Sequence, residues 1–113
     1  MKIEIQIPIY DRLLTVCDDP KEQPHPELGN GTLGIVWNDG NNIFFTFKRT
    51  EEFGGSALAH ECLHIAHAVF RICGVNADEY HDEHTAYLLM YLYKVMFDFV
   101  FHPEKYKKYS KKS

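Results

Sequence analysis

The chain has 113 residues, of which 45% are hydrophobic and 14% aromatic, and its formal net charge is −4. This length suits one domain with a real core, and the composition excludes a disordered chain outside the C-terminal tail. Residues 1–104 carry seven basic and sixteen acidic side chains, a net charge of −9. Because phosphate binding needs a basic face, we do not expect nucleic acid as the main partner.

The C-terminal end is rich in lysine. Five of the twelve basic residues lie in the last nine positions, namely Lys105, Lys107, Lys108, Lys111 and Lys112. We expect a single domain over residues 1–104 and a tail over residues 105–113 that mainly keeps the protein soluble.

The sequence predicts a cytoplasmic location. The N-terminal residues alternate between apolar and polar, so they do not resemble a secretory signal, and no apolar run is long enough to span a membrane. The cysteines are Cys17, Cys62 and Cys73, and three cysteines cannot all pair within one chain. This cysteine content indicates a reducing compartment.

Two strands are expected near the N-terminus. Isoleucines alternate with other residues over positions 3–9, the period of a strand with one buried face, and Pro8 indicates that this strand ends at an edge. A second short strand is predicted at Leu13–Cys17. Residues 18–30 are polar and contain three prolines, so we expect a surface loop in which His25 is solvated.

A hairpin is predicted after this loop. Thr32–Trp37 and Ile43–Phe47 are rich in β-branched and aromatic residues, and the connection over 38–42 contains Asp39-Gly40, a sequence that suits a turn with positive φ. The expected sheet has three or four strands and is mainly antiparallel.

Two long helices complete an α+β fold. The first is expected over about residues 56–73, with Ser56 as N-cap and Gly74 as C-cap. The second is expected over about residues 82–101, where His102-Pro103 stops it.

The second helix carries an apolar stripe at helical spacing, which we expect to pack on the first helix and the sheet. Its members are Ala86, Leu89, Met90, Tyr93, Met96, Phe97 and Val100. Exposure is expected for Tyr91, Phe99 and Phe101, and this leaves room for a dimer, although the sequence does not determine the oligomeric state.

The first helix contains the pattern His-Glu-x-x-His over residues 60–64. Residues four apart lie on one face of a helix, so His60 and His64 can direct their imidazoles at a single ion, for which zinc is the best candidate. Glu61 lies about 100° further round the helix, within reach of a water beside that ion. His67 extends the same histidine face by one more turn.

A catalytic zinc usually takes three protein ligands, so a third ligand is needed. The metzincin pattern would require glycine in place of His67 and histidine in place of Phe70, and it is therefore disfavoured. A carboxylate from the next helix is available at Glu83, nineteen residues after His64. His67 stays open as an alternative third ligand, as a group on the substrate side, or as an exposed residue.

Residues 56–93 resemble the gluzincins, zinc metallopeptidases in which a second helix after the motif helix bears a glutamate ligand. The resemblance implies that His60, His64 and Glu83 are the zinc ligands and that Glu61 is the general base. These peptidases usually have an aspartate four residues after the glutamate ligand, which orients the first histidine. That position is Tyr87 here, whose hydroxyl could accept the N–H of His60, although more weakly than a carboxylate. The resemblance also implies that the strand at the edge of the cleft is Ile43–Phe47.

The whole layout is similar to small zincin-like proteins encoded by phages and prophages, which implies a bacterial or phage-infected cell. The expected function is therefore a zinc-dependent metallopeptidase that acts on a peptide or protein substrate. The donor to the developing oxyanion is left open among Tyr80, His81, His84 and Tyr87. The alternative is a non-catalytic zinc-binding domain that interacts with another protein.

Overall fold

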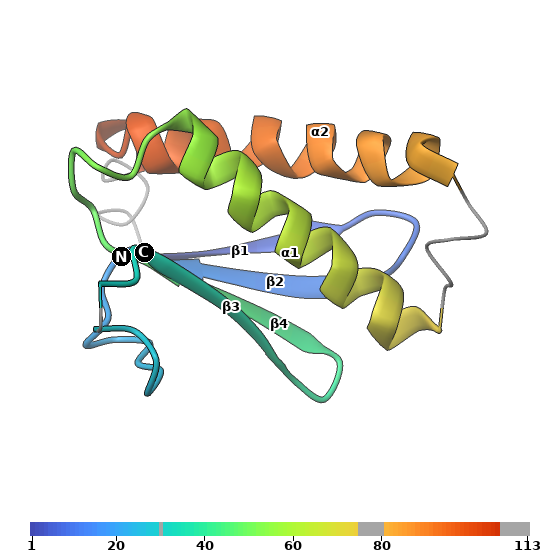
Figure 1. The fold of residues 1–113 in the computed structure, drawn as a ribbon, viewed down its shortest axis with the longest axis horizontal. Helices are drawn as coiled ribbons and strands as arrows, with labels where there is room; N and C mark the ends of the chain where they lie inside the picture. The colour runs from blue at the N-terminus through green and yellow to red at the C-terminus, as the bar shows by residue number, and fades with distance from the viewer. Residues whose placement is uncertain (30, 75–80, 107–113) are drawn as a thin grey trace.

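The structure is a computed structural model, which describes residues 1–29, 31–74 and 81–106; for residues 81–84 it describes the backbone alone. The described part contains four strands and two long helices (Figure 1). The strands are β1 (Lys2–Ile7), β2 (Arg12–Cys17), β3 (Gly34–Asp39) and β4 (Asn42–Phe47), and the helices are α1 (Gly55–Cys73) and α2 (His81–Phe101). The α+β class and the four-stranded sheet on two helices are confirmed.

The sheet has the order β1-β2-β4-β3, in which only the β2–β4 pair is parallel. The hairpin of β3 and β4 turns at Gly40, whose φ is +61°, as expected from Asp39-Gly40. The prediction that Ile43–Phe47 forms the strand at the cleft edge is wrong, because β4 lies inside the sheet and β3 is the edge strand beside α1. Ile43, Phe45 and Phe47 of β4 are all fully buried, as suits a strand that has a neighbouring strand on each side.

The first strand is shorter than the isoleucine pattern suggests. It ends at Ile7, and Ile9 lies in the turn to β2 with 95% of its surface exposed. The Tyr10 amide donates a hydrogen bond to the Pro8 carbonyl at 2.8 Å, and Ile9 between them has a φ of +73°. Pro8 thus ends the strand through a tight γ-turn, so alternation cannot continue to Ile9.

One face of the sheet carries the helices: α1 packs on β3, β4 and α2, and in Figure 1 it crosses in front of the strands. The other face is covered in part by the loop after β2. There Gln23 is buried and donates to the Thr46 hydroxyl at 3.0 Å, and the His25 ring lies 4.8 Å from that of Trp37. The expectation of a solvated His25 is wrong in part, because the residue is half-buried and its ring contacts that of Trp37 in a tilted arrangement.

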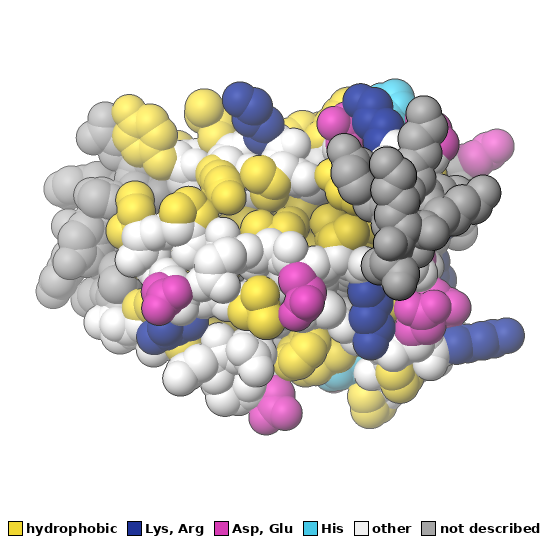
Figure 2. Space-filling view, turned by 180° about the vertical axis from the view of Figure 1, so that it is seen from behind, with side chains coloured by type: hydrophobic (Ala, Val, Ile, Leu, Met, Phe, Trp, Pro, Cys, Tyr) yellow, Lys and Arg dark blue, Asp and Glu magenta, His cyan; other side chains and the backbone are white. Residues whose placement is uncertain are grey.

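The packing face of α2 is rotated by about one residue from the predicted stripe. The buried residues are Leu88, Leu92, Met96, Phe99 and Val100. Met90 is 66% exposed and Phe97 is 37% exposed, whereas Phe99, expected outside, is fully buried. The helix is apolar on nearly all sides, so the sequence period does not define its phase. Hydrophobic side chains remain at the surface along α2, at the top of Figure 2.

Arg49, in the connection between β4 and α1, joins three segments of the fold. It donates to the carbonyls of Phe99 and Val100 at the end of α2, and its Nη2 and Nε atoms both donate to Oδ2 of Asp18, at 2.8 and 3.0 Å. Its guanidinium also lies over the Phe99 ring at 5.5 Å. The last carbonyls of α2 are thereby satisfied by a cation.

The ends of α1 differ slightly from the prediction. The N-cap is Gly54 rather than Ser56, with no hydrogen bond from a capping side chain, and Gly74 is the C-cap with a φ of +72°. In the described part of the chain, neither helix combines the length and apolarity that crossing a membrane requires.

Candidate metal centre

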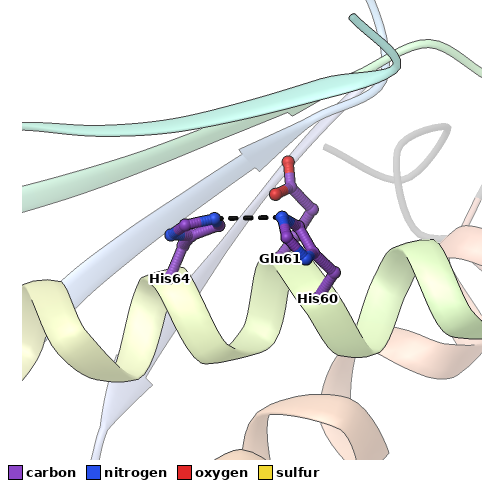
Figure 3. Close-up of side chains that lie close together, drawn as sticks. All are labelled: His60, Glu61 and His64. Carbon is purple, nitrogen blue, oxygen red and sulfur yellow. Dashed lines mark hydrogen bonds between the residues drawn. The ribbon is translucent and has the colours of Figure 1, made fainter.

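His60 and His64 lie on successive turns of the exposed side of α1 and converge at their ring tips (Figure 3). Their Nε2 atoms are 3.1 Å apart, and the two rings are inclined by 77°. At this distance the two nitrogens either share a hydrogen or bind one ion. Two tetrahedral zinc ligands with Zn–N distances of about 2.0–2.1 Å lie about 3.3–3.4 Å apart, so the pair is close to the spacing of a zinc site.

Glu61 follows His60 but turns inward, toward the strands (Figure 3). Its residue surface is only 7% exposed, and its Oε2 atom is fully buried without a hydrogen-bond partner. One ligand atom from each of His60, Glu61 and His64 lies within 4.8 Å of the others. The structure therefore brings together the three motif residues that the sequence pattern selects.

Burial is the main influence on the ionisation of Glu61. It raises the pKa of the carboxyl above its ordinary value, and the neighbouring His64 and His60 oppose this effect. A carboxylate with a raised pKa and no hydrogen-bond donor at Oε2 is well suited to accept a proton. The adjacent Cys62 differs, because burial raises the pKa of its thiol to about 12 and keeps it protonated.

A pocket of about 340 Å³ opens beside the Glu61 carboxylate and His60. Its remaining lining comes from the segment leading into β3, from the segment before α1 and from the first turn of α1: Thr32, Leu33, Gly34, Phe53 and Ala57. Most of these residues are small or apolar. The carboxylate thus lies at the boundary between the histidine pair and an apolar space that can receive part of a ligand.

The donor set fits a divalent metal ion in its chemistry. Imidazole nitrogens suit zinc and similar transition metals, and both histidines are exposed, so further ligands can reach an ion between them. Among the side chains that the structure describes, the group that could hold a metal ion comprises His60, Glu61 and His64.

The other predicted site residues fall in different places. Tyr80 lies outside the described residues, as do the side chains of His81, Glu83 and His84, so Glu83 stays a prediction as third ligand. His67 is exposed on α1 and is not a member of the described group.

The side chain of Tyr87 is 67% exposed. It lines a second pocket, together with the β1–β2 turn residues Pro8, Ile9 and Tyr10. A role for Tyr87 in orienting His60 therefore stays a prediction without support from its position.

Sequence reasoning missed Gly34 and Phe53, which surround the Glu61 carboxylate. The sequence did contain a signal, since the glycine at position 34 interrupts an otherwise β-forming run. Comparisons of the chain with protein-family models, with curated proteins and with solved structures found no match.

Proposed function

We propose that this protein is a zinc-dependent hydrolase of peptide bonds, with Glu61 as general base and with His60, His64 and Glu83 as metal ligands. The observation that carries the proposal is the pairing of two imidazoles, 3.1 Å apart, with a buried carboxylate whose Oε2 has no partner. A site built only for structural zinc has no need of such a carboxylate, because leaving it unpaired in the interior costs stability.

Zinc, when bound, would supply the Lewis acidity that acidifies water and polarises a substrate carbonyl. Glu61 then takes the proton of the attacking water and delivers it to the leaving amine. The raised pKa of its carboxyl favours holding that proton between the two transfers.

An extended substrate has a suitable place beside α1. The strand β3 is at the end of the sheet and contacts α1, so its outer edge is available for an added peptide strand. The apolar pocket next to Glu61 would take a substrate side chain near the scissile bond. Both features support a peptide substrate.

The test combines metal content with turnover. Wild type, Glu61→Gln and the control Glu52→Gln are dialysed, analysed for zinc and incubated with an unstructured protein substrate. Glu52 is an exposed carboxylate before α1, so its substitution should change neither quantity. We expect one zinc per chain in all three proteins and a loss of turnover of about 10²–10⁴-fold in Glu61→Gln alone.

Two results would contradict the proposal. If the wild-type protein did not bind zinc, the proposed metal site would be wrong. Bound zinc with equal, background-level turnover in wild type and Glu61→Gln would favour the alternative, a non-catalytic zinc-binding domain that interacts with another protein.

A further inference from the structure

We propose that Gly34 of β3 is a positioning residue for Glu61, because the missing side chain at position 34 provides the space in which the carboxylate lies. Its catalytic consequence rests on the proposed function, whereas the contact itself can be tested without metal or substrate.

The geometry around Gly34 leaves no room for a methyl group. A Cβ at this position would lie 2.8 Å from Oε2 of Glu61, 3.2 Å from the Phe45 ring and 3.3 Å from the Phe53 ring. The first distance is below any normal Cβ contact, and the other two are tight. The Glu61 carboxylate therefore lies directly against the backbone of the edge strand.

The backbone at Gly34 gives no other reason for a glycine. Its φ lies outside the left-handed region, and the residue pairs with Phe47 in regular antiparallel register. Glycine within a strand is less stable than alanine and often marks a place where another group approaches the backbone closely. Here the approaching group is the carboxylate of Glu61.

The side chain that would move on substitution can be identified from the packing. Phe45 is fully buried and Phe53 is 4% exposed, and both rings pack on Phe47, with centroid distances of 5.5 and 5.0 Å. The carboxylate of Glu61, in contrast, is the end of a flexible side chain whose Oε2 has no hydrogen bond. A methyl group at position 34 would therefore displace the carboxylate rather than the rings.

This packing also explains how Glu61 keeps its position. No described donor holds Oε2, so the carboxylate is located by the walls of a space that β3 and Phe53 form. A displacement of the base by about 1 Å changes its alignment with the attacking water, and such a change can reduce a rate by about 10²-fold.

The contact is tested by a double-mutant cycle in the metal-free chain of 113 residues. Thermal unfolding is measured for Gly34→Ala, Glu61→Asp and the double variant. Aspartate is one methylene shorter, so it withdraws from the space that the alanine methyl enters. We expect the Tm of the double variant to lie at least about 4 °C above the additive value.

Gly54→Ala is the matched control, since a Cβ at Gly54 meets no atom within 4 Å and its φ is −98°. Its effect should add to that of Glu61→Asp without coupling. If Gly34→Ala fails to fold, the added Glu61→Asp should restore folding. Additive effects of Gly34→Ala and Glu61→Asp, or a double variant that also fails to fold, would overturn the contact.

The positioning role is tested with zinc-loaded protein and a peptide substrate. We expect Gly34→Ala to lower kcat by roughly 10–100-fold while KM changes little and zinc content stays equal to wild type. An unchanged kcat would overturn the role even if the thermal cycle shows coupling. If wild type has no turnover, the proposed function fails, and the thermal cycle still decides whether Gly34 seats Glu61.

Discussion

Two polar clusters in this protein differ in how fully their charges are paired. In the first, Asp18 binds Arg49 through two hydrogen bonds, and Arg49 also donates to carbonyls at the end of α2. In the second, His60 and His64 contact each other, and Oε2 of the neighbouring Glu61 is buried without a partner. The two clusters therefore make opposite contributions to the free energy of unfolding.

The difference indicates separate roles. A paired charge that also caps a helix stabilises the fold, whereas a buried carboxylate with an unpaired oxygen destabilises it and persists where function needs it. The Arg49 cluster thus holds α2 against the sheet, and the cluster on α1 is the candidate metal centre of the described molecule.

The largest effect is expected on zinc affinity when a substitution breaks the histidine pair. His64→Gln removes a proposed ligand and should lower zinc affinity by more than the roughly 10–100-fold that loss of an outer-shell partner costs. His67→Gln, on the same exposed side of α1, is the matched control and should leave affinity unchanged. Competition with a chromophoric chelator measures both. An equal loss in His67→Gln would make His67 a ligand and contradict the proposed ligand set.

The next largest effect is expected on stability when a substitution breaks the Arg49 cluster. Arg49→Met keeps apolar contact with the rings of Phe47 and Phe99 but removes the hydrogen bonds, and we expect a loss of about 2–4 kcal/mol in the free energy of unfolding. Urea denaturation measures this loss. Zinc content and turnover per folded molecule should stay at the wild-type level.

Lys105→Met provides the control for Arg49→Met. The ion pair of Lys105 with Asp98 has a distance of 3.3 Å, but both side chains are about half exposed. Its removal should change stability by less than about 0.5 kcal/mol. A similar loss in both variants would mean that the hydrogen bonds from Arg49 to the carbonyls of α2 do not make its cluster more stabilising than an exposed ion pair.

The smallest effect concerns pH and has opposite signs in the two clusters. Burial acts to raise the pKa of Asp18, but hydrogen bonds from the Met1 ammonium and Arg49 outweigh it and hold the pKa below its ordinary value. The stability that Asp18 contributes is therefore present above about pH 4 and is lost as the pH falls through its lowered pKa. Asp18→Asn should destabilise the protein at pH 7 and differ little from wild type in strong acid.

For Glu61 the pKa is raised in the folded state. The charged carboxylate therefore destabilises the folded protein fully above the raised pKa, and this destabilisation is absent below about pH 4. In metal-free protein, Glu61→Gln should gain stability on the order of 1 kcal/mol at pH 7 and lose this advantage as the pH falls toward 4. Chemical denaturation of wild type and both variants across this range provides the measurement. Parallel pH dependence in Asp18→Asn and Glu61→Gln would remove the contrast between the clusters.

Local features of the fold could be predicted because neighbouring residues carry them. The absence of proline and the presence of Gly74 predicted α1, and Asp39-Gly40 predicted the hairpin turn. The histidine pair was equally accessible, since a spacing of four residues defines its geometry on any helix. The structure agrees with each of these expectations.

Features that depend on distant packing could not be predicted in the same way. The predicted packing face of α2 was wrong at Met90, which is exposed, and at Phe99, which is buried. A helix that is apolar on most sides can turn any of several faces toward the core. The edge position of β3 was also missed, since a hairpin sequence does not state which of its strands pairs with β2.

The sequence by itself determined that His60 and His64 share one helix face and that Glu61 stands beside them, because helical geometry follows from local spacing. Only the tertiary structure decided that Glu61 is buried and that its carboxylate lies against Gly34, nearly thirty residues earlier in the chain. The physical reason is that desolvation and close contact arise between segments brought together by folding, and spacing along one helix contains no information about them.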